Sequence, residues 1–187
     1  RERFLAASQP EKVSFTEGQL AILKALEALT TRYRDAAAAA GNTQSAASLD
    51  RLLSDAPHTL RDALQLQRIL HFTMWCAGNY HNTLGRFDQY MMPYLQADLD
   101  AGRLTEESAL ELLEEFFLTF NLDSDLYPGM QQGDNGQSMV LGGMTPEGKD
   151  GFHLLSRLCL QASLELRLID PKINLRVSRR SEERRVG

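Results

Sequence analysis

Apolar side chains recur at helical spacing over most of the chain. Leucines return every third residue from Leu20 to Leu29, which predicts one long amphipathic helix. Residues 14–17, Ser-Phe-Thr-Glu, have the form of a capping box and predict where this helix begins. Gly41 follows a run of alanines and predicts its end, because glycine readily adopts the left-handed conformation that closes many helices.

A second helical region follows after a short polar stretch. Residues 43–48 are small and polar and predict a connector, and Leu49 opens a short helix behind it. A stronger helix begins at Leu60, and by Trp75 its apolar residues surround it almost completely. A helix that is apolar all round is usually buried, so we expect its last turn to deliver residues 78–82 into the protein interior.

The second half of the chain alternates helices with short strands. Pro93 interrupts a helical pattern, which predicts a short helical turn at residues 85–91 and a new helix from the proline, where a missing N–H costs little. The remaining predicted elements are an acidic helix at 104–120, a strand at 138–141, a turn at 145–148, a helix at 154–166 and a strand at 173–177.

The predicted fold class is mostly α, with two or three short strands. Two short strands that lie far apart in sequence leave unpaired backbone groups, so we expect each to pair with strands outside this chain. No internal repeat and no linker divides the chain. The expected organisation is one partial domain over residues 1–178, helical from 14 to 120 and strand–helix–strand from 138 to 178.

Composition narrows the class of protein. The hydrophobic content is 43% and the net charge is -5, which argues against disorder and against nucleic acid or an anionic membrane as a partner. No apolar run is long enough to span a bilayer, and no secretory leader is visible. Cys76 and Cys159 both lie in helical patterns and do not form a disulfide framework. These features predict a reduced, cytoplasmic protein.

Common ligand motifs are weak. Asn121, Asp123 and Asp125 alternate like the start of a calcium loop, but Leu126 occupies the glycine position of that loop and Gln132 its glutamate position. The glycines at 129, 133 and 136 do not form a phosphate-binding pattern. The four histidines lack zinc-binding spacing, and we expect no bound metal.

One cluster remains after this sorting. Tyr80 and His81 follow the apolar helix and precede a Gly-Arg-Phe-Asp turn. An imidazole in a desolvated pocket has its pKa and hydrogen bonding set by its neighbours, which suits a binding site. The alternative is a histidine that only stabilises the end of a helix through the helix dipole. The residues alone do not decide between these two interpretations.

The central segment resembles a known family. It reads Gly85-Arg86-Phe87-Asp88-Gln89-Tyr90-Met91-Met92-Pro93-Tyr94, and Leu104-Thr105-Glu106-Glu107 follows it. Weaker matches are Leu141-Gly142-Gly143, the helix from Leu155 to Ala162, and Pro171 with Leu175-Arg176-Val177. In this order, over roughly residues 57–178, they resemble the glycyl-radical enzymes related to pyruvate formate-lyase.

The resemblance implies a large ten-stranded α/β barrel, usually a homodimer, that works in anaerobic metabolism as a lyase, a dehydratase or a formate acetyltransferase. In this family a radical on a backbone glycine passes to a cysteine inside the barrel, and the thiyl radical abstracts hydrogen from a small-molecule substrate. A separate radical-SAM activase with an iron–sulfur cluster installs the glycyl radical. On this basis the chain is expected to be a slice of such a barrel that binds no cofactor itself.

The chain also departs from the family pattern. The thiyl cysteine and the radical glycine lie beyond the matched residues, and neither Cys76 nor Cys159 matches the reactive position. We therefore expect no catalytic residue in this chain and no activity from it alone. Residues 179–187 form a charged run without apolar period and are expected to be a disordered or artefactual tail. The alternative is a free-standing helical interaction module whose acidic helix at 106–120 binds a partner.

The resemblance also suggests which residues meet the substrate. The positions matching Tyr80 and His81 lie at the substrate pocket in the family, where pyruvate formate-lyase itself has two alanines and glycerol-dehydratase-like members have His-Ser. Tyr-His adds a hydroxyl and an imidazole, which predicts a hydroxylated, aminated or acidic substrate rather than pyruvate. The structural part of the motif is expected to be Gly85, Arg86, Asp88 and Gln89, with Arg86 and Asp88 bonded to each other or to backbone.

Overall fold

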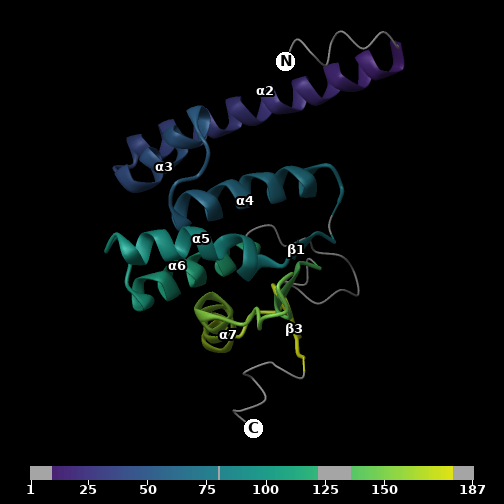
Figure 1. Ribbon diagram of the computed structural model, residues 1–187. Helices are drawn as coiled ribbons and strands as arrows, with labels where there is room; N and C mark the ends of the chain where they lie inside the picture. Colours follow the sequence, from purple (N-terminus) through teal and green to yellow (C-terminus); the bar gives the residue numbers. More distant parts are fainter. Residues whose placement is uncertain (1–9, 80, 122–135, 179–187) are drawn as a thin grey trace. The chain divides into compact units, whose positions relative to one another are not determined.

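The computed structural model describes residues 10–79, 81–121 and 136–178 (Figure 1). It contains two compact units, Arg1–Pro57 and His58–Gly187, where the sequence shows no separating linker. Each unit is described by itself.

The first unit is a pair of helices. Helix α2 (Pro10–Ala39) is followed by helix α3 (Thr43–Ser54), and Arg34 joins them through an ion pair with Asp50 at 3.1 Å. Gly41 closes α2 as predicted: its φ is +74° and its N–H donates to Ala38 O at 3.0 Å.

Two sequence predictions for this unit are wrong. Helix α2 does not begin at the capping-box pattern of residues 14–17, but at Pro10. A proline is well suited to the first turn because its N–H is not needed there. Residues 43–48 are not a connector, because they form the first half of α3. The Asn42 side chain accepts from Ser45 N at 3.1 Å and so caps a helix that small polar residues would start poorly alone.

The second unit opens with helix α4 (Leu60–Cys76), which starts where predicted. Thr59 and Asp62 form a capping box, with Asp62 N donating to Thr59 Oγ1 at 3.1 Å and Thr59 N donating to Asp62 Oδ2 at 3.2 Å. The prediction that α4 is buried all round is wrong: Leu70 and Met74 are 42% and 40% exposed. Only one side of the helix faces the core, because Leu60, Ala63, Leu64 and His71 carry its burial.

The centre of the chain also differs from its prediction. Residues 85–91 do not form a separate helical turn: strand β1 (Thr83–Gly85) leads directly into one continuous helix, α5 (Phe87–Asp100), with Pro93 inside it. The proline removes one helical hydrogen bond. The buried positions Phe87, Met91 and Leu95 lie on both sides of it, so packing outweighs the lost bond.

Two further helices match their predictions. Helix α6 (Glu106–Leu118) begins at Thr105, whose hydroxyl accepts from Ser108 N at 3.2 Å, and passes into a 3-10 turn, η1 (Thr119–Asn121). Helix α7 (Leu154–Leu166) has the predicted bounds. The apolar stripe of α6 is buried in the core, with Leu113 at 0% and Phe117 at 1% exposure. That stripe is therefore part of the core of this unit.

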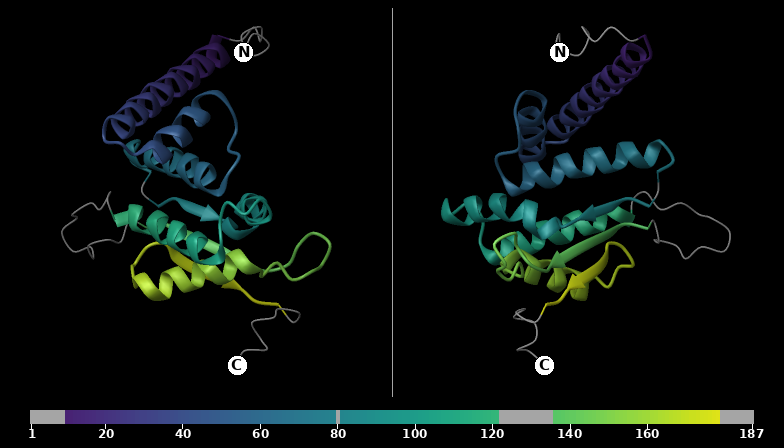
Figure 2. Two further views of the ribbon diagram at one scale, coloured as in Figure 1. Left: turned by 90° about the vertical axis from the view of Figure 1, so that its left-hand side faces the viewer. Right: turned by 45° about the vertical axis from the view of Figure 1, so that its right-hand side comes forward.

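The described strands form one parallel sheet in the order β1-β2-β3, with β2 (Ser138–Gly142) between β1 and β3 (Lys172–Arg176) (Figure 2). The prediction that the two later strands pair only outside this chain is wrong, since they pair with each other over five residues. The sequence could not show this because α7 is the crossover that brings them side by side. Three short strands in a mostly helical chain confirm the predicted fold class.

The core lies between the sheet and the helices. Leu84, Met139 and Leu141 point from the strands into one apolar cluster that also includes side chains of α4, α5, α6 and α7. Figure 1 shows α5, α6 and α7 on the same side of the strands. The helices therefore cover one face of the sheet, and the side chains that alternate with the core residues point to the other face.

Candidate functional site

Burial alternates from residue to residue just before strand β1 and at its start. His81 and Thr83 are exposed, whereas Asn82 and Leu84 are buried. Leu84 belongs to the core under the helices, so His81 and Thr83 share the opposite face. His81 therefore lies on the face of the sheet that the helices leave open.

That open face is mostly polar. In β2 the buried Met139 and Leu141 alternate with Ser138 and Val140, and in β3 the register pairs Ser138 with Lys172 and Val140 with Asn174. The face so defined, which we call the polar face, consists of His81, Thr83, Gly136, Ser138, Val140, Lys172, Asn174 and Arg176. It offers an imidazole, two hydroxyls, an amide and two cationic groups, which suit hydrogen bonding to a polar molecule.

Several groups of the polar face already make interactions within the chain. Thr83 Oγ1 donates to Ser138 O at 3.0 Å, which ties β1 to β2. Lys172 Nζ lies 3.1 Å from Asp170 Oδ1, and the Asp170 side chain is fully buried. This ion pair partly neutralises the lysine, and His81 adds an imidazole that can both donate and accept a hydrogen bond.

Gly136 lies directly beneath His81, and sequence reasoning missed this residue. A Cβ on Gly136 would lie 2.0 Å from His81 Nδ1 and 2.8 Å from Cε1, so the imidazole rests on bare backbone. The strand pairing next to them brings the two residues near each other. Thr83, the first residue of β1, pairs with Ser138, the first residue of β2, and His81 and Gly136 each lie two residues before these partners. The available signal was a glycine two residues before a predicted strand.

The two residues predicted to bind substrate have different outcomes. Tyr80 lies outside the described residues. His81 is exposed, which corrects the expectation that the end of α4 delivers residues 78–82 into a desolvated interior. The physical reason is strand alternation: Asn82 takes the buried position, and its side chain donates to Asn79 O. His81 is consequently turned to the polar face.

The Gly-Arg-Phe-Asp-Gln segment fastens the carboxyl end of β2. Arg86 Nη2 donates to Gly142 O at 3.2 Å and to Met144 O at 3.1 Å. Asp88 Oδ2 accepts from Gly142 N at 2.7 Å and from Ser156 Oγ at 2.5 Å. Arg86 and Asp88 thus hold the two sides of the same peptide segment, rather than each other.

Gln89 extends this contact to the start of α7. Its Nε2 donates to Gly151 O at 2.6 Å and lies 3.3 Å from His153 Nε2. Burial lowers the pKa of His153, with Asp88 acting in the opposite direction, so the ring is neutral at pH 7 and accepts from the glutamine. This interaction locks the junction between β2 and α7.

Cys159 does not have the environment of a reactive thiol. Cys159 is fully buried beside Asp88, and both burial and the carboxylate raise its pKa. A protonated, buried thiol is a poor nucleophile, and Cys159 belongs to the core cluster. Cys76 is exposed. It lies at the end of α4, where only one side of the helix is covered.

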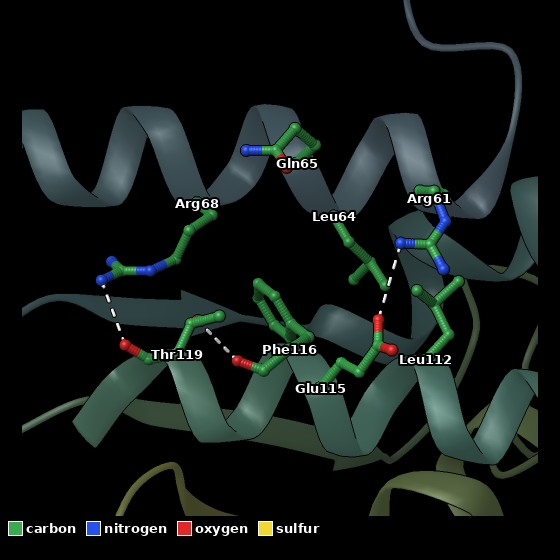
Figure 3. A pocket seen from close by; sticks show the side chains of 8 residues that line it. All are labelled: Arg61, Leu64, Gln65, Arg68, Leu112, Glu115, Phe116 and Thr119. Atoms are coloured by element: carbon green, nitrogen blue, oxygen red, sulfur yellow. Dashed lines mark hydrogen bonds and ion pairs between the residues drawn. The ribbon is translucent and has the colours of Figure 1, made fainter. Parts of the chain in front are cut away.

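A separate hollow of about 150 Å³ lies between α4 and α6 (Figure 3). Arg61 lies 3.5 Å from Glu115, and Arg68 Nη2 donates to Thr119 O at 3.2 Å. Its lining residues are Arg61, Leu64, Gln65, Arg68, Leu112, Glu115, Phe116 and Thr119. The residues that line this hollow include no cysteine and no histidine. The hollow is therefore less suitable than the polar face for acid–base or nucleophilic chemistry.

Arg68 also contacts a buried histidine. Its Nη1 lies 3.0 Å from His71 Nδ1, and the His71 ring meets Phe120 edge-on at 5.4 Å. Because the guanidinium only donates, His71 Nδ1 accepts and the ring is neutral. Burial, assisted by the charge of Arg68, lowers the pKa of His71 to about 4.

This depressed pKa predicts an acid-sensitive contribution to stability. The unfolded chain takes up a proton near pH 6.5 while the folded chain resists it until about pH 4. The stabilising effect is therefore complete above pH 6.5 and declines as the pH falls towards 4, by about 3 kcal/mol at most. We expect His71→Gln to reduce the change in the free energy of unfolding between pH 6.5 and 4.5, measured by urea-induced unfolding. His58→Gln, at an exposed position, should keep the wild-type slope; equal slopes in all three proteins would contradict this assignment.

The described residues place no three potential metal ligands together. Within the same residues, no helix has the length and apolar character needed to cross a bilayer.

Comparison with known proteins identifies the family. The family model described as pyruvate formate lyase-like matches residues 7–185. The chain belongs to the pyruvate formate lyase-like family. The sequence-based identification is thereby confirmed.

Curated relatives in this family include lyases and dehydratases. The chain is 39% identical over 106 residues to isethionate sulfite-lyase of Nitratidesulfovibrio vulgaris, a match that covers 54% of this chain and 13% of that protein. It is 30% identical over 139 residues to (2S)-3-sulfopropanediol dehydratase of Klebsiella oxytoca, which covers 71% of this chain and 17% of the relative. The matched segments thus cover less than a fifth of the length of these two relatives.

Solved structures of the family show the same fold. A glycyl radical enzyme from Archaeoglobus fulgidus superposes with a TM-score of 0.78 at 22% identity, over 87% of this chain and 23% of that one. The chain therefore has the fold of one part of these barrel enzymes. In a barrel with helices outside, the sheet face opposite the helices is the inner one, and His81 lies on that face here.

Proposed function

We propose that this chain is part of a glycyl-radical lyase or dehydratase that acts on a small polar molecule, and that His81 contacts the substrate. The observation that carries the proposal is the position of His81 on the polar face, opposite the helices. The matched relatives include a lyase and a dehydratase, which supports this reaction class.

The chemistry of the polar face suits a hydroxylated, aminated or acidic substrate. An imidazole can accept a hydrogen bond from a hydroxyl through one ring nitrogen and donate one to a leaving oxygen through the other. Tyr80 is proposed to add a phenolic hydroxyl from the neighbouring position. Arg86, Asp88 and Gln89 do not reach the polar face through the contacts described, and we assign them to positioning the segment after β2.

The reactive groups themselves are proposed to lie in the full-length protein outside this chain. The whole enzyme would carry a glycyl radical installed by a radical-SAM activase, pass it to a cysteine, and act in the cytoplasm as a homodimer. The role of this segment would be to supply three strands and a polar surface that binds and orients the substrate. A dry, shaped chamber of this kind also protects radicals from side reactions.

The test is His81→Ala in the full-length activated enzyme. We expect kcat/KM to fall by about 10- to 100-fold, because a general acid–base or hydrogen-bonding group contributes on that order. The glycyl radical, measured by electron paramagnetic resonance, should form at the wild-type level, since His81 is not part of the buried core. His58→Ala is the control, because His58 is an exposed histidine that precedes α4 and is not part of the polar face. Unchanged kinetics in the His81 variant would refute the proposed contact.

A further inference from the structure

We propose that Gly136 is a positioning residue for His81 and thereby determines which substrates the polar face accepts. This inference rests on the proposed function, because it assigns a consequence to the contact between His81 and substrate. Gly136 itself has no side chain to offer. It acts by leaving a space in which the imidazole lies.

The contact involves most of one ring edge. An ideal Cβ at Gly136 would lie 2.0 Å from His81 Nδ1, 2.8 Å from Cε1 and 3.0 Å from Cγ. Distances under about 3 Å are well inside van der Waals contact, so the ring and a Cβ cannot occupy these positions together. The absence of a side chain at position 136 is therefore a condition for the observed ring position.

The backbone also favours glycine here. The φ of Gly136 is +72°, in the left-handed region that residues with a Cβ adopt at a cost. The residues that follow Gly136 are held by the adjoining strands, because Thr83 and Ser138 are partners and Lys172 N donates to Gln137 O at 2.8 Å. The base under the ring is thus held by hydrogen bonds from the neighbouring strand.

A side chain at position 136 would move the ring rather than the sheet. The clashing atoms belong to the ring of a single side chain with two rotatable bonds, whereas Gly136 is part of the backbone two residues before β2. The ring would turn to another rotamer. The displaced imidazole would change both the hydrogen bonds it offers to a substrate and the space beside Thr83 and Ser138.

Histidine NMR on this chain tests the position of the ring. We expect Gly136→Ala to shift the imidazole resonances of His81, which His81→Ala identifies among the four histidines. Gly148→Ala is the matched control: Gly148 has a φ of +73°, but a Cβ there meets nothing within 4 Å. Both variants pay a similar backbone cost, and only the first should move His81. Gly136→Asn is the second variant, because asparagine tolerates positive φ while still placing a Cβ under the ring.

Kinetics of the full-length activated enzyme test the consequence. We expect Gly136→Ala to lower kcat/KM for the native substrate by about tenfold and to change the preference between a smaller and a larger polar substrate. In the His81→Ala background the same substitution should have little further effect, since it acts through the imidazole.

The outcomes are distinguishable. Unmoved His81 resonances in both Gly136 variants, or a Gly136→Ala effect that persists undiminished in the His81→Ala background, would overturn the role of Gly136. Shifted resonances together with normal kinetics in the His81→Ala enzyme would overturn the proposed substrate contact of His81, and with it the link to specificity. Shifted resonances with a Gly136 effect that requires His81 support both.

Discussion

Phe87→Ala is expected to lower the free energy of unfolding by about 3 to 5 kcal/mol. Phe87 is 0% exposed at the start of α5, stacks on Phe116 with ring centroids 5.6 Å apart, and meets Tyr90 edge-on at 5.8 Å. Phe116 in turn packs against Phe120 at 5.0 Å. Removing Phe87 therefore leaves a cavity between α5 and α6 that rigid aromatic neighbours fill poorly.

Urea-induced unfolding followed by circular dichroism measures this loss. Leu164→Ala is the control in the same unit, because Leu164 is 75% exposed on α7 and its removal should change stability by less than about 0.5 kcal/mol. Equal midpoints for the two variants would show that the aromatic cluster does not carry the stability of this unit.

Asp88→Ala is expected to cost about 3 kcal/mol, through a different mechanism. Asp88 is 0% exposed and accepts from Gly142 N at 2.7 Å and Ser156 Oγ at 2.5 Å. Truncation leaves both donors buried without this acceptor, and a buried donor without a partner costs on the order of 1 to 3 kcal/mol. The junction between β2 and α7 should also open, so amide hydrogen exchange at Gly142 should quicken.

The matched control is Asp100→Ala on the same helix. Asp100 is exposed at the end of α5 and accepts only from Gln96 Nε2 at 2.8 Å, which is worth a few tenths of a kcal/mol. Unfolding of the two aspartate variants at the same urea concentration would contradict the stabilising role assigned to the buried hydrogen bonds of Asp88.

The elements that were predicted correctly are those in which local pattern and tertiary packing agree. Helix α7 combines a clear apolar stripe with a start beside Ser156, and its predicted bounds are those of the structure. Helix α5 was divided wrongly because Pro93 is a strong local signal against a helix, while the buried side chains on both sides of it are visible only once the core exists. Tertiary packing overrode the local signal in this case.

The candidate site was predictable only in part. The resemblance pointed to His81, but periodicity alone placed it in a buried interior, because the apolar surround of α4 suggested a helix covered on all sides. Strand alternation after α4 placed the side chain on the polar face instead. For Gly136 the sequence offers only a glycine two residues before a predicted strand, because its contact with His81 arises between segments that are 55 residues apart.

The wide separation of paired strands has a consequence for synthesis on the ribosome. When β1 emerges, its partner β2 is still unmade, and the three helical segments from Phe87 to Asn121 are synthesised before it. Contacts between residues distant in the chain form late, because closing a long loop costs entropy first. Nascent protein stopped before residue 138 would therefore display the apolar edge of an unmatched strand, which is the surface that chaperones recognise and that self-association exploits.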